Sequence, residues 1–430
     1  MPLLRSYATL AELFNDVFGT HMQFPVFSFG FFVGLAFLGA GWVLYMELRR
    51  KEKAGVFTPT KETIIEGKPA TMPEIGWNAL IGYIIGFKLG GILFDWSAFN
   101  ENPQSFVFST EGNIVVGLVG ALVFGYWKYR DAKKQELPEP REKTILVYPS
   151  HRLGDFVMLA AVFGILGAKV FSNFEEENGW KEFFDDMLGN FFNGLSIYGG
   201  LVFGAIAIIW FAVKKKINVR HLGDAVAPAL ILAYGIGRIG CQVSGDGDWG
   251  ILNTAYISEA NGSLKEVEKG AHIAILEEHS AYYTKEFDSL PAVKSAYIKA
   301  PSFLPRSLFA QNYAHNVNGE GMYIAGCQGN WCGQLPISVF PTPIYETIMA
   351  LIIFAILWWL RRRVTTPGMI LAIYVILVGV ERFFIEKIRV NNVLEFMGIH
   401  ATQATFISII FIIFGLGMVM LMKRMHKNSI

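Results

Sequence analysis

Long apolar runs recur along this chain and constrain its fold more than any other feature of the sequence. Charged residues make up only 17% of the 430 residues, whereas soluble domains average about 25%. About 20 apolar helical residues span the hydrocarbon core of a bilayer, where helices satisfy their own backbone hydrogen bonds. The sequence therefore predicts an all-α polytopic integral membrane protein with about nine transmembrane helices. They lie near residues 24–46, 75–96, 113–128, 153–172, 194–213, 223–243, 343–360, 368–388 and 401–422.

Lysine and arginine residues alternate between the two sides of these spans. The segments after the first, third, fifth and seventh spans and the C-terminal tail are rich in both, and the other short segments are poor in them. Because basic segments stay on the cytoplasmic side, we expect the N-terminus outside and the C-terminus inside.

The longest segment between two spans, residues 251–339, then lies outside as an insert. Its content of Tyr, Asn, Gly and Pro favours a small folded unit over a linker. Cys327 and Cys332 in the insert would face an oxidising compartment, where we favour a local disulfide over two free thiols. The pattern divides the chain into an N-terminal region of about three helices, a transmembrane region, the insert and a C-terminal transmembrane region: residues 1–150, 151–250, 251–339 and 340–430.

The composition gives no support to several classes of partner. The net charge of +1 gives no reason to expect nucleic acid. The three cysteines have the spacing of neither a disulfide framework nor a metal site. We therefore expect no metal ion and no cofactor.

Five basic residues fall within the predicted spans, and four of them lie toward the outer ends. An ionisable group in a span is costly and usually marks a functional site, although a long side chain can also snorkel to the surface. Lys88 is the exception, because it lies in the middle of its span. The other four are Lys169, Arg238, Arg382 and Lys387.

Further polar residues gather at the same ends of the spans. Asp246 and Asp248 follow Arg238 in a Gly-rich turn, and Glu386 follows Arg382 at a spacing that places both on one helix face, where they can pair. The clustering favours a functional site over chance snorkelling. Two arginines at headgroup depth predict a phospholipid headgroup as the ligand, because the guanidinium fork binds phosphate oxygens. The fifth, seventh and ninth spans open with more polar residues: Tyr198, Tyr345, Glu346 and Gln403.

Asp155 and Asp224 lie at the inner ends of their spans instead. An acidic residue at a helix N-terminus accepts hydrogen bonds from free backbone N–H groups and interacts favourably with the helix dipole. We therefore expect structural roles for both residues.

Five short motifs, in their order along the chain, resemble those of the prolipoprotein diacylglyceryl transferases. The longest is Gly237–Gly250, with the sequence GRIGCQVSGDGDWG. The others are Gly194–Gly200 (GLSIYGG), Pro341–Glu346 (PTPIYE), Arg382–Arg389 (RFFIEKIR) and the helix that starts at Gln403. The resemblance covers the chain from about residue 153 to the C-terminus, apart from the insert.

The resemblance implies an activity and a location. The family transfers the diacylglyceryl group of phosphatidylglycerol to the lipobox cysteine thiol of a prolipoprotein, which forms a thioether and releases glycerol phosphate. Its members are multi-pass proteins of the bacterial inner (cytoplasmic) membrane with the active site toward the periplasm, so the insert would be periplasmic. The implied partners are phosphatidylglycerol, prolipoprotein signal peptides with a lipobox cysteine, and membrane lipid.

The resemblance also implies roles for the polar residues. Arg238 and Arg382 would hold the phosphate and stabilise the charge that builds on the leaving group, and Glu386 would fix Arg382. Asp246 or Asp248 would orient Arg238 or a glycerol hydroxyl. Arg389 would hold the headgroup or the insert. Contacts with phosphatidylglycerol would also come from Tyr345, Glu346, Gln403, Gly199 and Gly200.

The chain departs from the family pattern at three positions. Tyr198 stands where the family often has histidine, and a tyrosine hydroxyl, with a reference pKa of about 10, is a poor base for the attacking thiol. Tyr198 would act as the base or position the headgroup, so the identity of the base stays open. Cys241 stands where asparagine is frequent, and we expect a small packed residue there. Phe340 stands where histidine is frequent.

Two other functions agree with the same residues. A family member that binds lipid or signal peptide without catalysis agrees with the missing histidine. A transporter of an anionic substrate would use the same cations as a pathway. Against the transporter, the two halves of the sequence show no obvious inverted repeat, and the polar groups gather at one face rather than at the midplane.

Overall fold

The computed structural model describes most of the chain, as two compact units. The described residues are 5–22, 24, 26–96, 99, 106, 109–176, 179–185, 196–287, 290, 293–389, 393–396 and 399–427. The signature unit comprises Met1–Glu47 and Arg220–Ile430, and the middle unit comprises Leu48–Val219.

A helix covers most of each predicted span. Among the described residues, six helices are long and apolar enough to cross a membrane, which agrees with a mostly helical polytopic membrane protein. The number of crossings and the orientation stay predictions. The helices that cover the predicted spans are α2 (Ser28–Lys53), α3 (Met72–Phe94), α6 (Ile114–Lys134), α7 (Leu153–Glu175), α10 (Ile197–Lys214), α11 (Val219–Ser244), α14 (Thr342–Leu360), α15 (Met369–Ile385) and α16 (Gln403–Lys427).

In the middle unit, α7 and α10 pack closely through glycine. A Cβ atom on Gly199 would lie 2.2 Å from the carbonyl oxygen of Gly167, and one on Gly167 would lie 2.5 Å from the carbonyl oxygen of Gly199. Small residues let membrane helices approach this closely. Gly199, which the sequence predicts in the phosphatidylglycerol site, therefore has a packing role in the middle unit.

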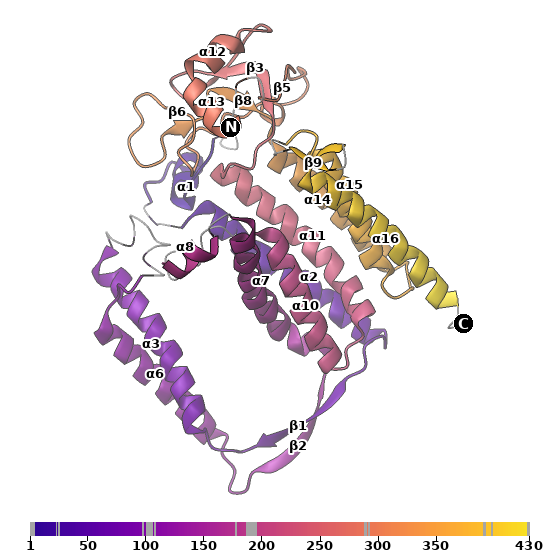
Figure 1. Cartoon of the computed structure of the whole chain (residues 1–430). Coiled ribbons are helices and arrows are strands. Elements are labelled where there is room, and N and C mark those ends of the chain that lie inside the picture. Colours follow the sequence, from indigo (N-terminus) through magenta and orange to yellow (C-terminus); the bar gives the residue numbers. More distant parts are fainter. Residues whose placement is uncertain are drawn as a thin grey trace. The chain divides into compact units, whose positions relative to one another are not determined.

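The middle unit also contains an antiparallel pair of strands that the sequence did not predict. Strand β1 (Thr60–Glu66) pairs with β2 (Arg141–Val147) along its whole length (Figure 1). Lys215 and Arg152 both bind the carboxylate of Glu62, and these hydrogen bonds lower its pKa below the usual range. The pairing joins segments far apart in the sequence, and local periodicity gives no sign of such contacts. A short helix, α8 (Gly179–Asp185), follows α7 in the sequence.

The helices of the signature unit share one apolar core. Ala227 and Ile231 of α11 pack against Ala350 and Leu357 of α14 and Ile370 of α15. Two short strands, β9 (Val393–Phe396) and β10 (Ile399–Thr402), connect α15 to α16. A short helix, α1 (Leu10–Phe18), precedes α2.

The insert folds as the small unit that its composition predicts. Strand β3 (Leu252–Ser258) lies at the centre of a four-stranded sheet and pairs with three other strands. Tyr283, Tyr313, Leu335 and Ile337 are buried in its core. The predicted disulfide between Cys327 and Cys332 is confirmed. The remaining elements are β4 (Leu264–Glu266), α12 (His272–Glu278), α13 (Ser280–Phe287), β5 (Ser295–Ala296), a 3-10 turn (Arg306–Leu308), β6 (Met322–Tyr323), β7 (Gly333–Gln334) and β8 (Ile337–Val339).

Asp224 has a structural role, but it caps a neighbouring helix rather than its own. Its carboxylate accepts hydrogen bonds from the backbone N–H groups of Gly368 at 2.8 Å and Leu371 at 3.1 Å, at the start of α15. The side chain is buried. Asp155 instead lies in the first turn of α7, 3.7 Å from Arg152, with a side chain that is about half exposed.

We predict that Asp224→Ala destabilises the protein by about 1–2 kcal/mol, because two N–H groups at the start of α15 lose their acceptor. Thermal unfolding in detergent measures the change. Asp155→Ala is the control: its side chain is partly exposed, and Arg152 keeps its ion pair with Glu62, so stability should change by less than about 0.5 kcal/mol. Equal effects of the two substitutions would contradict the assignment of the cap.

Candidate active site

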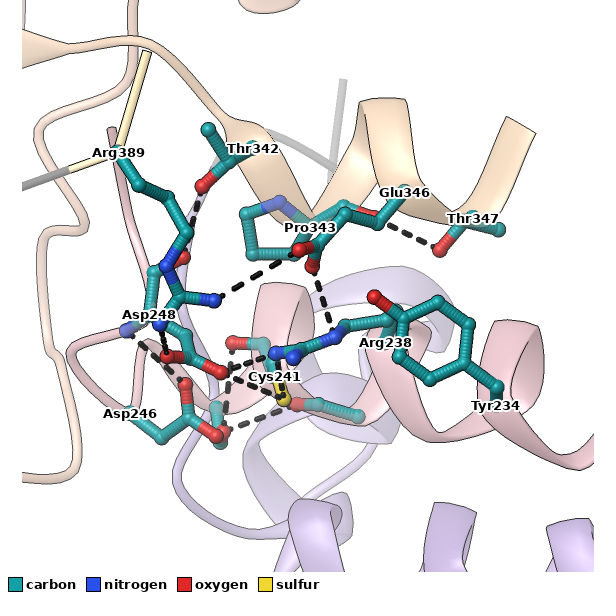
Figure 2. Close-up of polar contacts among 12 residues, drawn as sticks. Tyr234, Arg238, Cys241, Asp246, Asp248, Thr342, Pro343, Glu346, Thr347 and Arg389 are labelled. Carbon is teal, nitrogen blue, oxygen red and sulfur yellow. Dashed lines mark hydrogen bonds and ion pairs between the residues drawn. The ribbon is translucent and has the colours of Figure 1, made fainter. Parts of the chain in front are cut away.

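Arg238 lies near the end of α11, and the turn that follows brings an acid back to it. Gly245 and Gly247 have φ angles of +64° and +98°, which glycine adopts without strain. The chain therefore reverses directly after the helix, and the guanidinium of Arg238 donates a hydrogen bond to the carboxylate of Asp248 (Figure 2).

Glu346, in the first turns of α14, forms ion pairs with three arginines. Its oxygens lie 2.7 Å from Nε of Arg238, 3.5 Å from Nη1 of Arg382 and 3.6 Å from Nη1 of Arg389. The Glu346 side chain is fully buried. A buried carboxylate is stable only where cations compensate its lost hydration, so Glu346 holds the three guanidinium groups in one cluster.

Asp248 joins two of the same arginines from the other side. Arg238 and Arg389 both donate to its carboxylate, and Thr342 donates to its backbone oxygen at 2.8 Å. Arg389 is placed by a backbone bridge to Gly250. Burial raises the pKa of the Asp248 carboxyl, but the attraction of the two guanidinium groups outweighs it, so the pKa lies below the ordinary value.

Arg382 pairs with Glu386 at 3.5 Å, as the spacing of the two residues predicts. The Arg382 side chain is 23% exposed, against 9% for Arg238 and 13% for Arg389. Arg382 is therefore the arginine of this cluster that is most open to a ligand.

Asp246 and Cys241 complete this part of the site. The two residues interact, and the backbone N–H of Asp248 donates to the Asp246 carboxylate at 3.4 Å. Burial is the main cause that raises the pKa of Asp246 above the ordinary value. Cys241 is buried, as expected for a packed residue, with its sulfur 3.6 Å from Nη1 of Arg238.

Cys241, Asp246 and Asp248 also bring three metal-ligand atoms within 4.8 Å of one another. The sequence predicts no metal, because the spacing of the three cysteines is not that of a metal site. In the structure Asp248 neutralises two guanidinium groups. A metal ion at this position would compete with Arg238 and Arg389 for the same carboxylate.

The sequence analysis missed two residues beside the cluster. The ring of Tyr234 lies 5.2 Å from the guanidinium of Arg238, and its hydroxyl donates to Glu381 at 3.5 Å. Glu381 is buried. Its position inside a predicted span, directly before Arg382, is the signal that could have identified it.

The remaining predicted residues make other contacts or belong to the middle unit. The hydroxyl of Tyr345 donates to the backbone oxygen of Leu308, so it holds the insert onto α14. Gln403 begins α16 and is exposed. Tyr198, Gly199 and Gly200 begin α10 in the middle unit, and their roles toward the substrate stay predictions.

Lys88, the cation in the middle of a predicted span, has a structural role. Its ammonium group donates to the backbone oxygens of Phe106, Ser109 and Glu111 at 2.6 to 2.8 Å. These three bonds use all the donors of the ammonium group, so Lys88 fixes the segment before α6.

Comparison with known proteins agrees with the motifs. Residues 114–421 match the sequence model of the family described as prolipoprotein diacylglyceryl transferase. The chain belongs to this family. The match begins before residue 153, the start of the resemblance that the motifs indicate, and it includes the insert.

Two relatives show how far this diacylglyceryl transferase chain has diverged. A protein of Streptococcus uberis (strain ATCC BAA-854 / 0140J) is 26% identical over 273 residues, which cover 63% of this chain and 78% of the relative. A protein of Streptococcus pyogenes serotype M5 (strain Manfredo) is 25% identical over 284 residues, 65% of this chain and 82% of the relative. Both are named phosphatidylglycerol–prolipoprotein diacylglyceryl transferase.

We predict that Glu346→Gln destabilises the protein by about 3–5 kcal/mol, because three guanidinium groups lose the buried carboxylate that they share. Chemical unfolding in mixed micelles measures the loss. Glu386→Gln is the matched comparison, since Glu386 pairs with Arg382 at one end of the cluster, and its effect should be clearly smaller. A loss of less than about 1 kcal/mol for Glu346→Gln would contradict the central role of this carboxylate.

The two neighbouring aspartates should differ in their pH dependence. Because the pKa of Asp248 is lowered on folding, its ion pairs stabilise the protein above the unfolded pKa of about 4, and this contribution is lost as the pH falls through the folded pKa. Asp248→Asn should therefore destabilise the protein at pH 7, and the difference from the unsubstituted protein should stay constant down to about pH 4 and shrink below it. Thermal midpoints between about pH 2 and 8 measure both.

Asp246→Asn is the control for that comparison. The pKa of Asp246 is raised on folding, so its charged form is disfavoured in the folded protein and asparagine should be neutral or stabilising at pH 7. If Asp246→Asn destabilises the protein at pH 7 as much as Asp248→Asn does, the electrostatic assignment of the two acids is wrong.

Proposed function

We propose that this chain transfers the diacylglyceryl group from phosphatidylglycerol to the lipobox cysteine thiol of prolipoproteins. The reaction forms a thioether and releases glycerol phosphate. The observation that carries the proposal is the cluster of three arginines on Glu346, built from the motif residues of a chain that belongs to the diacylglyceryl transferase family.

The charges of the cluster suit a phosphate group. Three guanidinium groups face Glu346, Asp248 and Glu386. Asp248 is the most exposed of these acids, at 29% of its side chain, and it spans two guanidinium groups as a phosphate would. We propose that the lipid phosphate binds at the open side of Arg382 and shares Arg238 and Arg389 with Asp248.

The reaction then requires one bond to form as another breaks. The cysteine sulfur, as thiolate, attacks the diacylglyceryl carbon that carries the phosphate ester. The carbon–oxygen bond breaks, and its electron pair leaves on the phosphate oxygen of glycerol phosphate. The arginines stabilise this developing charge with groups already in place. The thiol proton goes to a base.

Tyr198 is our candidate for the residue that acts on the attacking thiol or on the lipid headgroup. It stands at the position where the family often has histidine, and it opens α10. We propose that its hydroxyl acts as the base or positions the headgroup by a hydrogen bond. A turnover that is unchanged in Tyr198→Phe would exclude both roles.

We also propose the topology that the basic residues indicate: about nine crossings, the N-terminus outside, and the insert and active site on the periplasmic side of the bacterial inner membrane. The four regions 1–150, 151–250, 251–339 and 340–430 remain our proposed division of the chain. The alternation of basic segments and the membership of the family support this arrangement.

The absence of the frequent histidine favours a second candidate, a protein that binds lipid or signal peptide without catalysis. It predicts binding of phosphatidylglycerol with no product. The two candidates differ in a single observable, the modified cysteine.

A direct test incubates the purified protein in nanodiscs with phosphatidylglycerol and a lipobox peptide, followed by mass spectrometry. We predict a diacylglyceryl adduct on the peptide cysteine and none on a peptide with Cys→Ser. Arg382→Ala should reduce the rate by at least about 100-fold, as expected for loss of a charge-stabilising donor.

The control is Arg363→Ala, because Arg363 is also basic but lies at the other end of α14, beside the ring of Trp359. It should leave the rate unchanged. No adduct from a folded protein that binds phosphatidylglycerol would support the non-catalytic candidate instead.

A further inference from the structure

The insert closes a small cavity against Arg389. The cavity has a volume of about 120 Å³, and its walls come from three places: the turn after α11, the insert, and Arg389. Trp249 belongs to the turn, and Tyr282, Glu320 and Val339 belong to the insert. The cavity therefore borders the arginine cluster, because Arg389 lines it and also contacts Asp248 and Glu346 (Figure 2).

The volume limits the size of a ligand group. A cavity of about 150 Å³ in another protein holds one benzene molecule, which has about six non-hydrogen atoms. The cavity beside Arg389 therefore takes a group of about that size. Glycerol has the same number of non-hydrogen atoms, and a whole phospholipid headgroup with its phosphate is larger.

The two charged residues that line the cavity differ in kind. The Glu320 carboxylate accepts hydrogen bonds from Tyr282 at 3.4 Å and Asn318 at 2.9 Å. Arg389 offers donors, and its buried Nε has no hydrogen-bond partner among the described residues. A ligand group that contacts both residues must donate to the carboxylate and accept from the guanidinium.

A hydroxyl group does both, whereas an ammonium group only donates. A polyol with adjacent hydroxyls can donate to Glu320 with one and accept from Arg389 with another. An ethanolamine headgroup would pair with Glu320 but leave Arg389 without an acceptor. The anion that neutralises the arginine cluster would lie next to the polyol, on the side of Arg382.

We propose that this cavity binds the glycerol of the phosphatidylglycerol headgroup, and that Glu320 and Tyr282 of the insert determine the preference for it. This inference rests on the proposed function, since it names the part of the same substrate that lies beyond the phosphate. It also gives the insert a role: the insert closes the active site over the headgroup that leaves as glycerol phosphate.

The test measures binding rather than turnover. Isothermal titration compares dihexanoyl phosphatidylglycerol with dihexanoyl phosphatidylmethanol, which keeps the phosphate and the acyl chains but lacks the glycerol hydroxyls. For the unsubstituted full-length protein we expect about tenfold tighter binding of phosphatidylglycerol, as for one or two hydrogen bonds to charged groups.

Two variants change the cavity in different ways. Glu320→Gln removes the acceptor charge, and Val339→Leu adds a methylene group to the cavity wall. Both should bring the affinity ratio of the two lipids close to one while the affinity for phosphatidylmethanol stays within about twofold. Thermal unfolding identifies any variant that fails to fold. In that case the affinity ratio of the other variant tests the proposal.

The matched controls come from the same insert. Glu266→Gln removes an acid that pairs with Lys299 at 2.6 Å, and Tyr297→Phe removes a hydroxyl that donates to Val267 at 3.0 Å. Neither residue lines the cavity, so both variants should keep the tenfold preference. Tyr282→Phe should reduce it.

Equal affinity of the unsubstituted protein for the two lipids would overturn the proposal. So would a preference that survives in both Glu320→Gln and Val339→Leu. If the protein is not a transferase, the result differs: it prefers phosphatidylglycerol as expected, but no adduct forms on the peptide. That outcome would still support the assignment of the cavity.

Discussion

One buried carboxylate, Glu346, holds the cluster of three arginines together. It lies at the start of α14, and its three arginine partners come from the end of α11, from α15 and from the segment after α15. Removal of a charge from water is costly unless opposite charges surround it. The position of Glu346 therefore fixes where three chain segments meet, and the rest of the site follows from that meeting.

The same cluster explains how an anionic lipid could bind without disrupting the fold. The three arginines balance Glu346, Asp248 and Glu386, so the site is stable without a ligand. Glu346 is fully buried, whereas Asp248 is 29% exposed. A phosphate can compete with the exposed acid while the buried one keeps the guanidinium groups in position.

The insert is part of this arrangement rather than an appendage. A Cβ atom on Gly250 would lie 2.6 Å from the backbone oxygen of Ile388, so glycine is needed where the insert begins beside Arg389. The hydroxyl of Tyr345 holds the other side of the insert at Leu308. The insert follows Gly250 of the first motif that supplies the cluster, and it contacts Tyr345 of the second and Ile388 of the third.

The sequence predicted the parts of this structure that depend on local spacing. The helices, the pairing of Arg382 with Glu386, the folded insert and the disulfide all follow from periodicity, composition or short separations. It did not predict that β1 pairs with β2, or that Asp224 caps α15. It named Glu346 as a residue that contacts lipid and did not show that three arginines share it, because contacts between distant segments leave no local pattern.

The most direct test of the account measures how phosphatidylglycerol binds when each arginine keeps its charge but loses its planar fork. Nanodisc binding assays would compare the unsubstituted protein with Arg238→Lys, Arg382→Lys and Arg389→Lys. If the three guanidinium groups around Glu346 bind the phosphate, each substitution should weaken binding by about tenfold or more. Unchanged affinity in all three folded variants would show that the phosphate binds elsewhere.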